Sequence, residues 1–170
     1  MSGIAKFEKV SFDEFYAGLT DVLPDTTKDE AMEIYNDIKL PKRATKGSAG
    51  YDFFAPYAFN IEPSQTIKIP TGIRAKMDES WVLCLFPRSG LGFKFRMQLN
   101  NTVGIIDSDY YYSDNEGHIF VKITNDSNEG KSLSVGKGQG FVQGIYLQYG
   151  ITVDDETDAV RNGGFGSTGN

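Results

Sequence analysis

The sequence predicts an all-β protein, a sandwich or barrel of many short strands, with a short helical segment in front of it. From Leu40 onward, short runs of strand-forming residues alternate with glycine-containing turns, which is typical of closed all-β folds. Before Leu40, apolar residues recur at helical spacing behind two capping patterns. At 170 residues the chain fits one domain that buries its own core.

The N-terminal segment predicts one strand and two helices. Lys6–Val10 is suited to a short strand, and Ser11–Glu14 and Thr27–Glu30 both have the pattern of a capping box. Pro24 and Pro41 bracket the second helix. The apolar stripes behind the two boxes are Phe12, Phe15, Tyr16 and Leu19, and then Ala31, Ile34, Tyr35 and Ile38. We expect both stripes to dock on the main body.

Four segments predict strands of that main body. Gln65–Pro70 alternates apolar and polar residues, and Trp81–Phe86 is a continuous apolar run of the kind buried on both faces. Ile119–Ile123 and Phe141–Val153 add further strand. Residues 1–40 are then a helical N-terminal extension, 41–155 the β domain and 156–170 a C-terminal arm. That arm is too rich in glycine to fold alone, so it is either disordered or orders on a ligand.

Composition and charge exclude several classes of protein. A net charge of −6 argues against a protein that coats nucleic acid, which needs a surplus of cations on one face. The longest apolar run, Trp81–Pro87, is too short to span a bilayer, and the first residues lack the layout of a secretion signal. Cys84, the single cysteine, lies in that run, so we expect it in the core without a disulfide. The expected protein is cytoplasmic and binds neither nucleic acid nor membranes.

Two segments have the composition of a site for a phosphorylated ligand. Pro87–Gly92 offers a guanidinium, a hydroxyl and backbone N–H groups directly after the most buried predicted strand. By itself this hexapeptide is more often an ordinary turn. Gly104–Tyr110 places Asp107 and Asp109 where strand periodicity would turn both carboxylates to one side, for a metal ion or for base catalysis. A solvated turn is the alternative there.

Taken together and in order, these segments resemble the motifs of the trimeric dUTP pyrophosphatase (dUTPase) family, across about Leu40 to Gly169. The five motifs are Ala49-Gly50-Tyr51-Asp52, Pro87–Gly92, Gly104–Tyr110, the Gly138–Ile145 segment that contains Gln143, and Gly163–Gly169. The resemblance implies a β jelly roll that forms a homotrimer with shared active sites and a flexible C-terminal arm that closes over the nucleotide. It also implies Mg²⁺-dependent hydrolysis of dUTP to dUMP and pyrophosphate, which keeps uracil out of DNA and supplies dUMP for thymidylate synthesis.

The resemblance also assigns roles to individual residues. Asp107 matches the carboxylate that activates water for attack on the α-phosphorus, and Asp52 matches an acid that orients water on Mg²⁺ without binding the ion directly. Tyr110 matches the aromatic residue that packs on deoxyribose, and Phe165 the one that stacks on uracil. The other substrate-binding residues are Asn101, Gly104 and Ile105 for the base, and Arg88, Ser89, Gly90, Gln143, Arg161, Gly166, Ser167 and Thr168 for the phosphates.

Three departures from the family pattern carry further expectations. Residues 111–118 form a longer stretch than the family's tight turn, so we expect a protruding loop in which His118 is exposed. Gln139-Gly140 replaces the family's acidic–basic pair, and a structural ion pair is therefore expected to be missing. Only Asn162 separates Arg161 from the double glycine, one residue fewer than usual, which leaves its contact with the γ-phosphate open.

Two other functions fit parts of the sequence. The dCTP deaminases share the fold and a similar arginine–serine turn, but their chemistry depends on a glutamate on the strand after the third motif, and His118–Ile123 contains no acid. A binding or regulatory protein is the second alternative, acting through the N-terminal helices and the extra loop. The presence of Asp107, Tyr110 and Phe165 favours catalysis over both.

Overall fold

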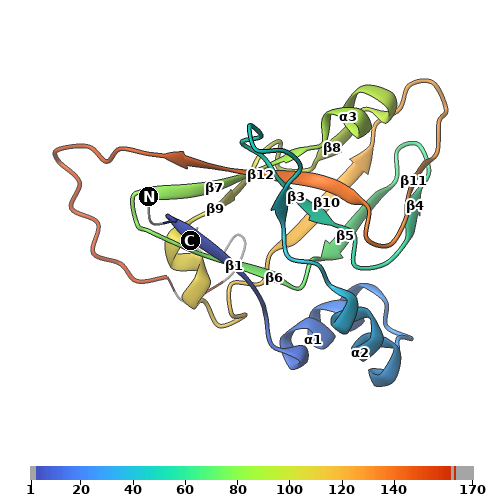
Figure 1. The fold of residues 1–170 in the computed structure, drawn as a ribbon, viewed down its shortest axis with the longest axis horizontal. Helices are drawn as coiled ribbons and strands as arrows, with labels where there is room; N and C mark the ends of the chain where they lie inside the picture. Colours follow the sequence, from blue (N-terminus) through green and yellow to red (C-terminus); the bar gives the residue numbers. More distant parts are fainter. Residues whose placement is uncertain (1–2, 162, 164–170) are drawn as a thin grey trace.

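The computed structural model describes residues 3–161 and Gly163. Two helical segments and many short strands make up the main body, and two helices precede it (Figure 1). The elements in chain order are β1 (Ala5–Lys9), α1 (Phe12–Val22), α2 (Lys28–Asp37), β2 (Lys42–Arg43), β3 (Tyr51–Phe54), β4 (Phe59–Ile61), β5 (Thr66–Pro70), β6 (Ile73–Met77), β7 (Trp81–Pro87), α3 (Ser89–Phe95), β8 (Met97–Leu99), β9 (Gly104–Ile106), the 3₁₀ helix η1 (Ser108–Tyr112), β10 (Phe120–Asn125), β11 (Leu133–Val135) and β12 (Gly140–Gln148). The predicted all-β class is confirmed.

The largest sheet has the strand order β2-β3-β12-β7-β9. A second sheet, β5-β10-β8, and two strand pairs, β1-β6 and β4-β11, complete the body, and every pairing is antiparallel. Strand β12 ends at Gln148, which pairs with Trp81, the first residue of β7. The expected strand to Val153 is therefore wrong at its end, because no partner strand extends beyond Trp81.

The core forms where the sheets face one another. In β7 the central residues Leu83, Cys84 and Leu85 are buried, as expected for a continuous apolar run. The other large side chains that are fully buried in the strands include Phe53, Ile61, Ile69, Ile106, Ile123 and Phe141. Burial raises the pKa of the Cys84 thiol, so this residue packs as a small apolar side chain rather than as a nucleophile.

The N-terminal extension is joined to the body by a strand and by helix packing. Strand β1 pairs with β6, and α1 packs on α2 and β5 at one end of the molecule (Figure 1). The second capping box is complete, because Thr27 and Glu30 each accept a hydrogen bond from the other's backbone N–H. The first box is only half formed. The Ser11 hydroxyl caps the N–H of Glu14, but the Glu14 carboxylate turns to His118 instead.

The expectation of an exposed His118 in a protruding loop is wrong. The loop after η1 folds against α1, and the His118 side chain is 0% exposed. Its Nε2 accepts the N–H of Gly72 at 3.0 Å, so Nδ1 carries the proton and donates to Glu14 Oε1 at 3.1 Å. Burial holds the pKa of His118 well below its ordinary value. The ring is therefore a neutral core residue between the loop and α1.

Gly18 allows α1 to approach this ring closely. A Cβ at this position would lie 2.9 Å from Phe120 Cζ and 3.0 Å from His118 Cε1. Glycine to alanine inside a helix ordinarily stabilises by about 0.5–1 kcal/mol, but overpacking a filled core costs about 1–3 kcal/mol. The close contact makes the change in stability unfavourable here, because both neighbours are rings held in the core.

Gly18→Ala is therefore expected to lower the free energy of unfolding by about 1–2 kcal/mol, measured by urea titration. The matched control is Gly92→Ala in α3, where nothing lies within 4 Å of the added Cβ. That control is expected to be neutral or slightly stabilising. A Gly18→Ala protein as stable as the parent would show that α1 is not packed as closely as described.

Candidate active site

A basic turn follows β7 and forms the first part of the site. Arg88 is the N-cap of α3, and its Nε pairs with Asp52 Oδ1 of β3 at 3.1 Å while its guanidinium also donates to the Gly140 carbonyl at 3.2 Å. Gln143 stands opposite Asp52 in the β12–β3 register and donates to the Pro87 carbonyl at 3.2 Å. These side chains and Ser89 line a cavity of about 370 Å³. We name this group the phosphate turn.

Gly50 shapes the same cavity from the first motif. A Cβ on Gly50 would lie 2.5 Å from Gln143 Oε1, so only glycine lets the glutamine amide take its position. Ser89 and Gly90 are exposed at the start of α3, facing solvent rather than the core. The structure thus brings together four residues that the sequence placed in three different motifs: Asp52, Arg88, Ser89 and Gln143.

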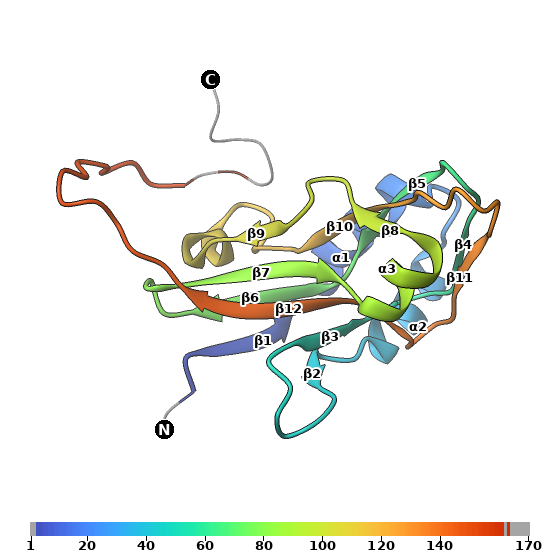
Figure 2. The same cartoon turned by 90° about the horizontal axis from the view of Figure 1, so that it is seen from above.

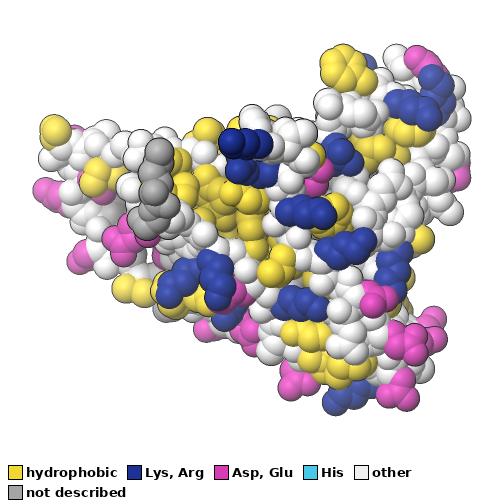
Figure 3. All heavy atoms as spheres, in the orientation of Figure 1, with side chains coloured by type: hydrophobic (Ala, Val, Ile, Leu, Met, Phe, Trp, Pro, Cys, Tyr) yellow, Lys and Arg dark blue, Asp and Glu magenta, His cyan; other side chains and the backbone are white. Residues whose placement is uncertain are grey.

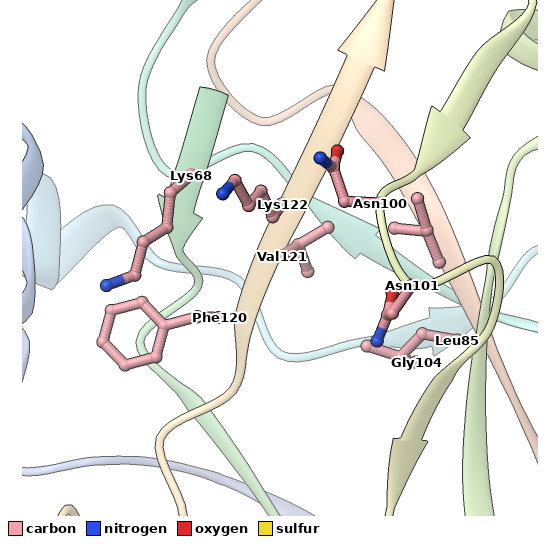
Figure 4. A pocket seen from close by; sticks show the side chains of 9 residues that line it. Lys68, Leu85, Asn100, Asn101, Gly104, Phe120, Val121 and Lys122 are labelled. Carbon is pink, nitrogen blue, oxygen red and sulfur yellow. The ribbon is translucent and has the colours of Figure 1, made fainter. Parts of the chain in front are cut away.

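The β8–β9 hairpin forms the second part of the site. Its two strands belong to different sheets, because β9 pairs with β7 whereas β8 pairs with β10. They consequently splay apart, and a largely apolar cavity of about 330 Å³ opens beside them, with Leu85, Asn101 and Gly104 on one side and Phe120 on the other (Figure 4). Leu99 and Val121 contribute further apolar surface. Ile105 is half exposed, pairs with Cys84 and does not line this cavity.

Two carboxylates form the third part, at the end of β9. The expectation that Asp107 and Asp109 share one face of a strand is wrong, because the strand ends at Ile106 and Asp107 is the N-cap of η1. Arg161 joins them instead, with NH2 at 2.6 Å from Asp107 Oδ2 and Nε at 2.9 Å from Asp109 Oδ1. The chain after β12 leaves the sheet and returns over η1 to make these contacts (Figure 2).

Tyr110 is held behind the carboxylates, with only 3% of its surface exposed. Its hydroxyl donates to the His118 carbonyl at 2.6 Å and accepts from Asn115 Nδ2 at 2.8 Å. Burial raises the pKa of this phenol. Sequence reasoning missed both partners, and the only signal for them was the extra length of the 111–118 stretch.

The phosphate turn and the carboxylates lie far apart within one chain. Ile106, which precedes Asp107, pairs with Leu83, whereas Arg88 follows the other end of β7. Five residues of extended strand correspond to roughly 17 Å. Arg88 also reaches towards β3, while β9 is at the opposite edge of that sheet. The cavity beside Asp107 and Arg161 shares no lining residue with the cavity of the phosphate turn.

Charge is distributed unevenly over the molecule. Lys and Arg side chains gather over the middle of the face in Figure 3, whereas most Asp and Glu side chains lie towards its ends. Within residues 3–161 and Gly163, no group of three or more His, Cys, Asp or Glu could hold a metal ion. No helix in the same part of the chain has the length and apolar composition of a membrane span. Four predicted contacts, Phe165, Gly166, Ser167 and Thr168, lie outside the described residues.

The site combines a basic turn, an apolar cavity beside the hairpin and a carboxylate at the end of the hairpin. This combination is typical of an all-β hydrolase of phosphorylated small molecules. The comparison with known families identifies which family of such enzymes the chain belongs to. The dUTPase family model matches residues 36–169, and the chain belongs to the dUTPase family.

Similar proteins and structures agree with this membership. Deoxyuridine 5'-triphosphate nucleotidohydrolase of Lactococcus lactis is 41% identical over 135 residues, covering 78% of this chain and 89% of the relative. The protein of the same name from Hahella chejuensis is 43% identical over 141 residues, covering 79% and 89%. The crystal structure of dUTPase from Streptococcus mutans superimposes with a TM-score of 0.63 at 32% identity, covering 88% of this chain and 98% of that one.

A more distant structure supports the fold alone. The dUTPase of Staphylococcus bacteriophage 80alpha, solved with dUPNHPP, is 19% identical with a TM-score of 0.64 and covers 99% of both chains. The jelly-roll prediction is confirmed by these matches together with the strand order above.

Proposed function

We propose that this protein hydrolyses dUTP to dUMP and pyrophosphate, the reaction named for its relatives of 37–43% identity. One observation carries the proposal. The family's carboxylate, Asp107, directly follows the hairpin strand β9, which lines an apolar cavity suited to a flat base. A base seated there places its sugar and α-phosphate towards Asp107 rather than away from it.

Asp107 is the proposed general base that takes a proton from the attacking water. In the structure its charge is shared with Arg161, which also holds Asp109. A nucleotide triphosphate brings several negative charges that compete for the same guanidinium, and Arg pairs favourably with phosphate oxygens. Transfer of Arg161 from the carboxylates to the terminal phosphates would leave Asp107 ready to accept a proton.

The base and the sugar are proposed to be read by the hairpin and by Tyr110. Gly104 has no room for a side chain, since a Cβ would lie 3.0 Å from Leu85 Cβ, and it lines the cavity together with Asn101, with Ile105 next to it in β9. The cavity wall is largely apolar, with Lys68 and Lys122 also lining it, and we propose that it takes uracil. Tyr110, fixed at its hydroxyl, presents its ring to the deoxyribose and leaves no room for a 2′-hydroxyl.

The phosphates and Mg²⁺ are proposed to bind at the phosphate turn. Arg88, Ser89, Gly90 and Gln143 would contact phosphate oxygens, and Asp52 supplies the one carboxylate in that cavity. A single carboxylate suits an ion that arrives on the triphosphate and keeps most of its waters. When bound, Mg²⁺ offsets the charge of the phosphates, while Asp52 orients a water molecule on it.

The separation within one chain supports a homotrimer with shared sites. One triphosphate cannot contact Arg88 and Asp107 of the same chain, because they lie beside opposite ends of β7, roughly 17 Å apart along the strand. Each site would combine the turn of one subunit with the carboxylates of another. The C-terminal arm would close it, with Phe165 on uracil and Gly166, Ser167 and Thr168 around the phosphates. The single, buried cysteine suits the cytoplasm.

Pyrophosphate release with Mg²⁺ should be measured for dUTP, dTTP, UTP and dCTP side by side. Release from dUTP alone is expected, because the bound hairpin is proposed to leave no room for the thymine methyl group and Tyr110 to leave none for the ribose hydroxyl. Ammonia release from dCTP would point to a deaminase instead. Release from none of the four would overturn the proposal.

Asp107→Asn is expected to bind dUTP but to lower kcat by at least about a hundredfold, since positioned base catalysis is worth roughly 10²–10⁴. Asp109→Asn is the matched control, because it weakens the same Arg161 interaction without removing the base. Its kcat is expected to fall less than about tenfold. Unchanged turnover in Asp107→Asn would remove this residue from the mechanism.

Deletion of residues 163–170 is expected to leave the trimer intact and to reduce turnover by at least about tenfold, since stacking on a base alone contributes roughly 1–3 kcal/mol. Assembly is followed by analytical ultracentrifugation and turnover by pyrophosphate release. Removal of Asn170 alone, which lies outside the family match, serves as the control. Equal activity in the truncated and full chains would contradict a closing arm.

A further inference from the structure

The N-terminal extension and the long loop after Tyr110 are bound to each other. The family match begins at residue 36, so β1 and α1 lie outside it. The Ser11 N–H and hydroxyl donate to the two carboxylate oxygens of Glu116 at 2.7 and 2.6 Å. Tyr111 in η1 donates its hydroxyl to Glu8 of β1 at 2.6 Å. Each of the two additions therefore supplies hydrogen-bond partners for the other.

His118 is the centre of this contact. Its ring is held at both nitrogens, by Glu14 of α1 and by the Gly72 N–H, and it packs 4.2 Å from the Phe120 ring centroid. Its backbone is also fixed, because its N–H donates to the Asn115 carbonyl at 2.9 Å. These contacts hold the carbonyl oxygen of His118 in a fixed position.

That carbonyl oxygen is the acceptor for the Tyr110 hydroxyl at 2.6 Å. Asn115, from the same loop, donates to this hydroxyl from the other side at 2.8 Å. The position of the Tyr110 ring is thus set by a loop that α1 holds in place. Tyr110 follows Asp107 by three residues in η1, and its N–H donates to the Asp107 carbonyl at 3.2 Å.

We propose that Glu14 and His118 are positioning residues for Tyr110, and that the N-terminal helix α1 sharpens the discrimination between deoxyribose and ribose by holding that ring. The inference rests on the proposed role of Tyr110 in dUTP hydrolysis. A ring that can shift by a fraction of an ångström admits a 2′-hydroxyl. A ring anchored through His118 does not.

The test is the ratio of kcat/KM for dUTP to kcat/KM for UTP in the full-length protein. Glu14→Ala removes the acceptor for His118 Nδ1 and is expected to lower this ratio by about tenfold, or about 1.4 kcal/mol of discrimination, because the Tyr110 ring is then less firmly held. A purely structural loss would reduce the active fraction for both substrates equally and leave the ratio unchanged. Asp13→Ala removes the neighbouring exposed acid from the same first turn and should not change the ratio.

Two further variants separate positioning from folding. Glu14→Gln keeps an oxygen acceptor for His118 and is expected to restore most of the discrimination. Asn115→Ala acts on the Tyr110 hydroxyl without touching α1, and is expected to lower the ratio as Glu14→Ala does, even if the latter folds poorly. Combined with Tyr110→Phe, which removes the hydroxyl itself, Glu14→Ala should have no additional effect.

The outcomes distinguish this inference from the proposed function. A parent protein that is inactive on dUTP would overturn the proposed function. A parent selective for dUTP, with an unchanged ratio in folded Glu14→Ala and Asn115→Ala, would overturn the positioning role alone. Additive effects of Glu14→Ala and Tyr110→Phe would also overturn the positioning role, because the two residues would then act independently.

Discussion

Strand β7 is hydrogen-bonded along both edges, to β12 and to β9, and its centre is buried on both faces. Its register places Gly104 beside Leu85 and Gln143 beside Phe86, and its last residue leads directly into Arg88. A slip of one residue would turn every one of these side chains to the other face. The three parts of the site are thus located by one strand, whose apolar side chains cannot move without exposing the core. The same rigidity keeps the phosphate turn and the carboxylates apart within one chain.

The long loop buries the His118 ring, and the helical extension provides one of the hydrogen-bond partners that this ring needs. A histidine in an apolar environment is costly unless both ring nitrogens have partners. Glu14 provides one partner and the backbone of Gly72 the other. Burial also raises the pKa of the Glu14 carboxyl, so the pair is placed in a poorly solvated contact between α1 and the body. Helix and loop therefore depend on each other: without α1 the ring would lose its acceptor, and without the loop the N-terminus of α1 would lose Glu116.

Features that depend on residues close in the sequence could be predicted, whereas pairs of side chains far apart in the sequence could not. The Thr27 capping box and the buried run of β7 depend on neighbours in sequence, and the structure has both as expected. The partner of Glu14 lies 104 positions away, and Arg161 lies 54 positions from Asp107. No periodicity encodes such pairs. The predicted Ser11 capping box is only half formed for this reason, because the Glu14 carboxylate binds His118 instead of the local backbone N–H. The prediction that Asp107 and Asp109 share one face of a strand was wrong because a 3₁₀ helix begins before Asp109.

The pairing of Arg161 with Asp107 and Asp109 would allow an acidic protein to hold a still more acidic substrate at the proposed site. Two aspartates beside a triphosphate would repel it strongly in a partly desolvated site. An arginine that bridges both carboxylates removes most of that repulsion before the nucleotide arrives, and its guanidinium has enough donors to be shared with phosphate oxygens afterwards. Arg161 belongs to the segment proposed to form the C-terminal arm, so the proposed exchange of its partners would be coupled to the proposed closing of the arm. Base activation would then follow substrate binding instead of preceding it.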